Sequence, residues 1–512
     1  MKKRLLSCLC AALLIPALLT GCWQEAPLPT GDGVGNPLPS GGQETAESRA
    51  ILPERFALPY APDRTLDPIA CSDEMQQVVS SLICEGLFRL GPDFEPEPWL
   101  CADYTYDPAT AVYTLVLRSG VTFSDGSPLT AADVKATLDR ARISERYQAR
   151  LAGITAVSAG DGAVTIALSA PNTGLPALLD VPIVKAGTEK NAAPVGTGPY
   201  LFSQEESGAY LVANQSWWQG DGQPVDRVSL VEAADQDTML YRFTSHDVQL
   251  ITADLTGTSP ISAIGNTSFR DANTTMLQYV GFNTARAPLD NAALRRALGL
   301  GINRAYVVSA FLSGHGAAAQ FPVSPASPLY PASLEERYSL EAFTSAVAAC
   351  GYAAERTLTL LVNTENSFKV SVAGYLAESF TAAGVPTEVR ALPWEAYSAA
   401  LAAGEFDLFY GEVRLTADWD VSALLATDGA LNYGGWADPQ TDHLLAAYSA
   451  AGDRAAALEA LCARVQSQAP ILPVCFKSTS VLIQADVLEG LSPTMAEPFY
   501  DLPACTVHLR ED

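Results

Sequence analysis

Three apolar segments separated by two amphipathic ones decide the fold: TLTLLVN (357–363), VPTEVRAL (385–392) and FDLFYGE (406–412). Their β-branched and aromatic residues are typical of strands. Between them, SFKVSVAGYLAESFTAA (367–383) has apolar residues at helical spacing, and WEAYSAALAAG (394–404) has the composition of a helix that ends at glycine. This β-α-β-α-β order with short connections predicts a parallel sheet with right-handed crossovers.

A cluster of polar residues follows the third predicted strand, in the stretch GEVRLTADWD (411–420). Ligands of open α/β sheets bind beyond the carboxyl ends of the strands, so this stretch is placed where a site would be. Carboxylates beside an aromatic ring suit a cationic group. A carboxylate pair for glycoside hydrolysis and a solvated loop with a buried tryptophan are the alternatives. The predicted ligand contacts here are Glu412, Arg414, Asp418, Trp419 and Asp420.

The sequence offers few candidates for catalysis. It has no H-E-x-x-H, no G-x-S-x-G, no P-loop lysine and no S-x-x-K. Its four histidines are scattered, and the glycines of PVGTGPY (194–200) lack the G-x-G-x-x-G spacing, so this segment is predicted to be a turn entering a strand. We predict a protein that is not an enzyme and that needs no cofactor or metal.

The start of the chain has the pattern of a secretory signal. Lys2, Lys3 and Arg4 precede an apolar run (5–19) that closes with LTGC (19–22). The run is shorter than the ~20 residues of a transmembrane helix. The following segment (23–50) is rich in Gly, Pro and Ser and predicts a flexible tether.

The net charge of the chain limits the kinds of molecule that it can bind. The chain has 31 Lys+Arg and 57 Asp+Glu, a net charge of −26; loss of the signal's three cations leaves 28 against 57, or −29. Such a surface disfavours nucleic acid and anionic headgroups. Seven of the ten cysteines lie beyond the lipobox region, an odd number whose pairing the sequence leaves open.

Further local signals indicate additional elements. Thr130 and Asp133 form a capping-box pattern, and Asp453 precedes apolar residues at helical spacing, so each predicts a helix start. The segments 113–123 and 162–170 alternate like strands.

Several motifs together resemble one family. They are TLDP (65–68), ICEGLFRLGPDFEPEPWLCADY (83–104), YTLVLRSGVTFSDGSPLTAADV (113–134), VGTGPYLF (195–202), GFNTARAPLDNAALRRALGLGINR (281–304) and SQAPILPVCF (467–476). Their order and spacing are similar to those of the family 5 extracellular solute-binding proteins of ABC transporters, the oligopeptide, dipeptide and nickel binding group. LTGC likewise resembles the lipobox of bacterial lipoproteins, which implies acylation of Cys22.

The resemblance implies an α/β, two-lobed fold of the periplasmic-binding-protein type II kind, with an additional subdomain in the first lobe. The chain would cross between lobes at 276–282 and 473–480. The implied parts are the signal peptide (1–22), the tether (23–50), lobe I (51–72, 190–276 and 478–512), the extra subdomain (73–189) and lobe II (277–477).

The resemblance also implies roles for individual residues. Peptide-binding members place a tryptophan and an aspartate at the strand end in the second lobe, and the aspartate pairs with the peptide's amino terminus. This chain departs from the usual Gly-Trp pair, since Glu412 follows Gly411 and the tryptophan comes only at 419. Asp418 or Asp420 would pair with the amino group, and Arg414 with an acidic group of the ligand or with Glu412. Further predicted contacts are Phe282, Asn283 and Asp67.

The expected function is capture of a short peptide or related amino-containing solute between two lobes, followed by delivery to an ABC permease and its ATPase subunits. The protein would act as an extracytoplasmic monomer, on the outer face of the cytoplasmic membrane or in the periplasm. It would touch the membrane through its lipid anchor alone and bind no nucleic acid. The alternative is a ligand-sensing or chaperone-like lipoprotein of the same fold that does not feed import.

Overall fold

The structure is a computed structural model that describes residues 52–220, 222–261 and 266–510. The predicted signal peptide, Cys22 and the tether lie outside these residues. Among the described helices, none is long and apolar enough to cross a membrane. The seven cysteines of this part of the chain are free.

A seven-stranded mixed sheet contains the three strands predicted first. Its order is β11-β17-β12-β16-β14-β15, with β13 paired to β17. β14 is parallel to both β15 and β16, as predicted, whereas β12 pairs with β16 and β17 in antiparallel orientation. The strands are β11 (Leu250–Ala253), β12 (Thr267–Phe282), β13 (Gly316–Ala318), β14 (Leu358–Asn363), β15 (Thr387–Leu392), β16 (Leu408–Arg414) and β17 (Ile471–Gln484).

The predicted helices connect the parallel strands. α7 (Ser367–Ala382) follows β14, and α8 (Trp394–Ala402) follows β15. Gly384 ends the first helical segment with φ +93°, a conformation that glycine adopts at low cost. β15 and β16 flank β14 on opposite sides, so the strand order reverses at β14. The carboxyl end of β14 is therefore the topological switch point.

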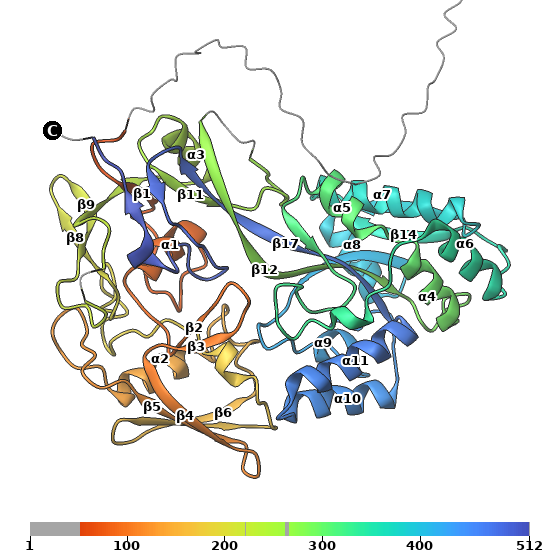
Figure 1. The fold of residues 1–512 in the computed structure, drawn as a ribbon, viewed down its shortest axis with the longest axis horizontal. Coiled ribbons are helices and arrows are strands. Elements are labelled where there is room, and N and C mark those ends of the chain that lie inside the picture. Colours follow the sequence, from red (N-terminus) through yellow and green to blue (C-terminus); the bar gives the residue numbers. More distant parts are fainter. Residues whose placement is uncertain (1–51, 221, 262–265, 511–512) are drawn as a thin grey trace, which may run out of the picture. The chain divides into compact units, whose positions relative to one another are not determined.

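Two long strands run through the seven-stranded sheet. β12 and β17 pair from Thr267 opposite Gln484 to Gly281 opposite Ile471, with irregular register between Asn273 and Leu277. Figure 1 shows the two strands extending from the part that contains β11 and α3 to the helices around β14. The two predicted crossing segments lie within these strands, while the exact lobe boundaries remain predictions.

Two further sheets precede this one. The first has the order β1-β10-β9-β8, and the second has the order β4-β5-β7-β6. Their strands are β1 (Ala57–Tyr60), β4 (Cys101–Asp107), β5 (Val112–Leu117), β6 (Ile154–Ala159), β7 (Ala163–Leu168), β8 (Tyr200–Glu205), β9 (Gly208–Ala213) and β10 (Arg227–Glu232). Two-stranded pairs are formed by β2 (Phe88–Leu90) with β3 (Pro96–Pro98) and β18 (Leu488–Glu489) with β19 (Thr506–Val507).

Both predicted helix starts are confirmed. The capping box of Thr130 and Asp133 begins α2 (Ala131–Ala141), and Asp453 caps α11 (Arg454–Gln468). In Figure 1, α10 and α11 lie side by side. The other helices are α1 (Glu74–Ser81), α3 (Gln236–Thr244), α4 (Ala292–Leu300), α5 (Arg304–Phe311), α6 (Leu340–Ala349), α9 (Ser422–Leu425) and α10 (Pro439–Ala450), with 3₁₀ turns η1 (Leu175–Leu178), η2 (Ala332–Leu334) and η3 (Leu502–Ala504).

Both faces of β14 and of the first half of β16 are buried. Leu360 and Leu408 belong to a core with α4 to α7, whereas their neighbours Leu361 and Phe409 belong to a core with α10 and α11. Successive strand residues point to opposite faces, so two apolar layers cover these two strands. β15, at the edge of the sheet, is largely open to solvent.

Candidate ligand-binding site

Glu412 lies at the carboxyl end of β16, next to the switch point. Gln278 of β12 stands opposite it and donates from Nε2 to the carboxylate at 2.8 Å. The Gln278 amide is itself held by the Tyr410 hydroxyl, which donates to its Oε1 at 2.8 Å. Since β16 extends to Arg414, the prediction that Glu412 and Arg414 lie beyond the strand was wrong by a few residues. Both belong to the strand end itself.

Lys477 of β17 lies beside Glu412. Its side chain is 3% exposed, and its Nζ lies 3.7 Å from Glu412 Oε2. Lys477 also forms a short ion pair with Asp254, which follows β11. The ammonium is therefore shared by two carboxylates, and the group connects three strands of the sheet.

Lys369 is a second buried lysine, in the first turn of α7. It is 7% exposed, and burial lowers the pKa of its ammonium. The charge of Glu412 acts in the opposite direction and that of Lys477 in the same direction, so the ammonium lies in their field. Within the described part of the chain, this ammonium has no hydrogen-bond or ion-pair partner.

The start of α7 contacts the segment after β11. Asn366 caps the helix by accepting from the Lys369 backbone N–H at 3.1 Å, and its Nδ2 donates to the Thr256 carbonyl at 2.9 Å. Asn366 is 2% exposed. The helix start, with its outward N–H groups, is thus held against the loop that also supplies Asp254.

Trp394 lies at the end of the next strand, β15. Its indole is 58% exposed and stacks on Tyr397, with ring centroids 5.8 Å apart. The Trp394 backbone N–H donates to Glu365 Oε1 at 2.7 Å, and the Asn363 amide donates to Oε2 at 2.9 Å. An exposed ring therefore stands near the ends of β14 and β15.

Trp419, a predicted contact, is in the core. It is 1% exposed, and its ring meets Phe94 and Phe476 edge to face at 5.0 and 5.8 Å. Its indole N–H donates to Ser327 Oγ at 3.2 Å. The indole thus has a complete set of protein partners, which is the arrangement expected of the structural alternative. The predicted ligand contact stays a prediction.

Asp418 and Asp420 differ sharply in their surroundings. Asp418 is 4% exposed and accepts from Thr416 Oγ1 at 2.6 Å and Asn172 Nδ2 at 3.0 Å. Asp420 is exposed and accepts from the Ser422 backbone N–H and hydroxyl at 2.9 and 2.6 Å. Asp418 therefore joins distant segments, whereas Asp420 closes a local turn.

The remaining predicted contacts are dispersed. Arg414 is exposed near Glu412, opposite Met276. Phe282 and Asn283 lie at the other end of β12; Phe282 is buried, and Asn283 Nδ2 donates to the Gly404 carbonyl at 3.2 Å. Asp67 is buried and forms a short ion pair with Arg140. The structure places Glu412 and Arg414 on the same strand end and joins Asp418 to the Asp420 backbone N–H at 3.3 Å, but it does not gather the predicted contacts into one cluster.

Sequence reasoning missed the two buried lysines. Lys477 is the single charged residue in the strand ILPVCFKSTSVLIQ (471–484). Lys369 precedes Val372 and Leu376 by three and seven residues, so it belongs to the apolar face of the helix. In both cases the detectable signal was a cation at a position that the apolar pattern assigns to the core.

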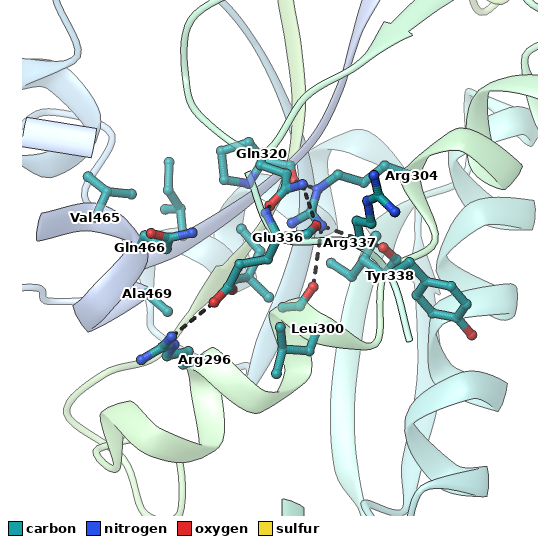
Figure 2. Close-up of a pocket in the computed structure, with 15 residues that line it drawn as sticks. Arg296, Leu300, Arg304, Gln320, Glu336, Arg337, Tyr338, Val465, Gln466 and Ala469 are labelled. Carbon is teal, nitrogen blue, oxygen red and sulfur yellow. Dashed lines mark hydrogen bonds and ion pairs between the residues drawn. The ribbon is translucent and has the colours of Figure 1, made fainter. Parts of the chain in front are cut away.

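A separate small hollow lies between α4, α11 and the start of β17 (Figure 2). Arg296 pairs there with Glu336 at 3.0 Å. Arg304 donates from Nε to the carbonyls of Pro473 and Ala319 at 2.8 and 3.1 Å. Both guanidinium groups are engaged in contacts within the chain, so the hollow does not compete with the strand ends as a binding site.

Comparison with known proteins decides the family. Residues 95–430, more than half of the chain, match the family described as bacterial extracellular solute-binding proteins, family 5 middle. The chain belongs to solute-binding protein family 5. The resemblance inferred from the sequence is thereby confirmed.

Relatives of this solute-binding protein include the glutathione-binding protein GsiB of Escherichia coli K12. The two are 27% identical over 281 residues, which cover 51% of this chain. The matched part spans about half, 54%, of the relative's length.

Solved structures share the fold. The substrate-binding protein CtaP of an ABC transporter of Listeria monocytogenes is 18% identical, with TM-score 0.72, and the match covers 89% of this chain and 99% of CtaP. The murein tripeptide binding protein MppA, in its unliganded open form, is 20% identical, with TM-score 0.73 and coverage of 90% and 99%. The predicted fold class, a two-lobed α/β fold of type II with an added subdomain, is confirmed.

Proposed function

We propose that this protein is the substrate-binding protein of an ABC importer, which captures a short peptide or related amino-containing solute and delivers it to a permease driven by ATPase subunits. Family membership and the names of the relatives, which include peptide and glutathione binders, support this role. The protein performs no reaction on the solute.

One observation carries the proposal: a carboxylate, Glu412, stands at the end of β16 at the switch point of the sheet. Gln278 fixes it from β12, and the Lys477 ammonium lies 3.7 Å away. A carboxylate at this position suits the ammonium group of a peptide or amino acid. Arg414, Asp418, Trp419 and Asp420 complete the proposed lobe II contacts, with Phe282, Asn283 and Asp67 as outer candidates.

The proposal includes attachment to the outer face of the cell membrane. Acyl chains on Cys22 would bury methylene groups at about 0.8 kcal/mol each, and more than one chain holds a folded domain at a bilayer. Expression of a Cys22→Ala variant tests this point. The full-length protein should fractionate with membranes, and the variant should be released; equal membrane association of both would refute the anchor.

Binding is tested by native mass spectrometry of the purified protein with its co-purified solutes. We expect an amino-containing solute in the wild type and its loss in Glu412→Gln, which keeps the shape but removes the charge. Glu378→Gln, on the exposed face of α7, is the matched control. If the wild type binds no member of a broad peptide panel and none co-purifies, the proposed function is wrong.

A further inference from the structure

We infer that the extra subdomain carries a latch, which holds the two lobes together before any solute binds. The latch consists of the segment 171–174, between β7 and η1, and of Phe94, in the turn between β2 and β3. Both parts contact lobe II, at the loop 418–419 and at the junction of α10 and α11. The latch thus sets how much of the solute-free protein is closed.

The first support is a set of direct hydrogen bonds between the lobes. The Thr173 backbone N–H donates to the Ser449 carbonyl at 2.9 Å, and the Thr173 hydroxyl donates to the Ala451 carbonyl at 2.8 Å. In the opposite direction, the Ser449 hydroxyl donates to the Pro171 carbonyl at 2.7 Å. Arg454 donates from Nη1 to Thr173 Oγ1 at 3.2 Å. The junction of α10 and α11 is therefore bonded to a segment that precedes it by 276 to 278 residues.

The second support is that the segment 171–174 belongs firmly to its own subdomain. Tyr113 of β5 donates from its hydroxyl to the Asn172 carbonyl at 2.9 Å, and Asn172 Oδ1 accepts from the Gly174 backbone N–H at 2.7 Å. Leu175 and Leu178, which follow, are buried in the core of that subdomain. The hydrogen bonds to α10 and α11 therefore join two folded bodies, and a change in one bond acts on the closure of the lobes.

The third support is the backbone conformation of two aromatic residues that meet between the lobes. Phe94 and Trp419 have φ values of +68° and +54°, and their rings lie edge to face with centroids 5.0 Å apart. Bulky side chains rarely adopt positive φ, because Cβ then crowds the backbone. Such strain persists where the surrounding structure enforces it, and it is concentrated in segments that bind or switch. Both strained residues take part in the same contact between the lobes.

The latch side chains act apart from the proposed solute contacts. Thr173, Ser449, Arg454 and Phe94 are not among those contacts, so the latch forms without a solute. A solute that binds the closed form has an apparent affinity proportional to the closed fraction. The latch therefore raises the affinity for the solute, and this consequence alone rests on the proposed function.

The test measures closure of the solute-free protein by small-angle X-ray scattering. The protein is dialysed first, and native mass spectrometry establishes that no solute remains. The double variant Thr173→Val/Ser449→Ala removes the two hydroxyl groups of the latch and nearly keeps the side-chain volumes. We expect the ratio of closed to open molecules to fall by about tenfold, because several hydrogen bonds between the lobes are lost. The radius of gyration should rise accordingly.

Phe94→Gly tests the aromatic contact, because glycine adopts the same positive φ at low cost and removes the ring. It should also raise the radius of gyration, and the triple variant with Thr173→Val and Ser449→Ala should raise it most. Thr110→Val/Ser207→Ala makes the same substitutions in exposed turns and should scatter as the wild type. Circular dichroism establishes that each variant is folded.

Equal radii of gyration in the wild type and the triple variant would overturn the latch. None of these scattering measurements uses a solute, so their outcome is independent of the proposed peptide capture. If the triple variant opens and no peptide binds to the wild type, the latch stands and the proposed function fails.

Discussion

Two buried charged residues, Glu85 and Lys369, differ in whether their charged groups have hydrogen-bond partners. The Glu85 carboxylate accepts four hydrogen bonds, from the indoles of Trp99, Trp217 and Trp218 at 2.9, 3.1 and 2.8 Å and from the Thr197 hydroxyl at 2.7 Å. Lys369 has no partner among the described residues.

The difference separates a carboxylate that links distant segments through hydrogen bonds from an ammonium that forms none with the described residues. Thr197, Trp217 and Trp218 lie more than 100 residues from Glu85 in the sequence, so the carboxylate links distant segments. Burial raises the pKa of Glu85, and the four hydrogen bonds oppose that rise. At Lys369 the charges of Glu412 and Glu365 oppose the lowering of the pKa by burial, but no group among the described residues forms a hydrogen bond or ion pair with the ammonium.

The largest expected change in stability follows substitution of Glu85. Glu85→Ala leaves three indole N–H groups and one hydroxyl without an acceptor, and each such group costs ~1–3 kcal/mol. We expect the free energy of unfolding to fall by about 4 kcal/mol or more in urea titrations. Glu378→Ala, an exposed change on α7, should stay within about 0.5 kcal/mol. Similar unfolding midpoints for the two variants would contradict the structural role of Glu85.

Substitution of Asp418 tests whether a carboxylate that already accepts hydrogen bonds within the protein can also contact the ligand. Asp418→Ala removes the acceptor of Asn172 and Thr416, so stability should fall by about 2 kcal/mol. Asp420→Ala, with only its local turn to lose, should fall by less than about 1 kcal/mol. Calorimetric titration of both with the bound solute then separates the roles. If Asp420→Ala lowers the affinity for the solute while the stability stays normal, this result would support Asp420 as a ligand contact.

Glu497 extends the comparison to a half-buried acid whose pKa is shifted upward. Burial raises the pKa of Glu497 from 4.5 to about 7. Between pH 4.5 and 7 the folded state thus holds more protons than the unfolded state, so this residue makes stability fall as the pH rises through that window. We expect about 1–2 kcal/mol, reduced by the partial exposure of the side chain. Thermal unfolding at pH 5 and pH 8 measures it, and Glu497→Gln should remove the difference.

The smallest effect is expected for Lys369. Lys369→Met removes an ammonium whose charged form burial disfavours and which has no partner among the described residues, so the protein should gain up to about 1 kcal/mol of stability. Burial lowers the pKa of Lys369 below its ordinary 10.5, so the penalty is present in full at low pH and disappears as the pH approaches 10.5. The gain should therefore shrink between pH 7 and pH 10. Destabilisation by Lys369→Met at pH 7 would show that the ammonium has a partner within the chain.

The sequence predicted correctly those elements that depend on interactions between residues close together in the chain. The capping box of Thr130 and Asp133, the turn at Gly384 and the three strands of the parallel unit involve residues near one another in sequence. The antiparallel strands β12 and β17, which complete the sheet, come from distant segments, and the predicted parallel β-α-β-α-β unit did not include them. Sheet pairing over such separations depends on the packing of the whole fold.

The candidate site shows the same division. The sequence by itself determined the family, the parallel unit and the position of Glu412 near a strand end, because periodicity, capping and motif order are local properties. Only the tertiary structure decided that Trp419 packs in a core, that Asp418 is bound by Asn172, and that two lysines approach Glu412. Lys369, Glu412 and Lys477 lie on three separate elements, and their charges meet only when the sheet and its helices are assembled.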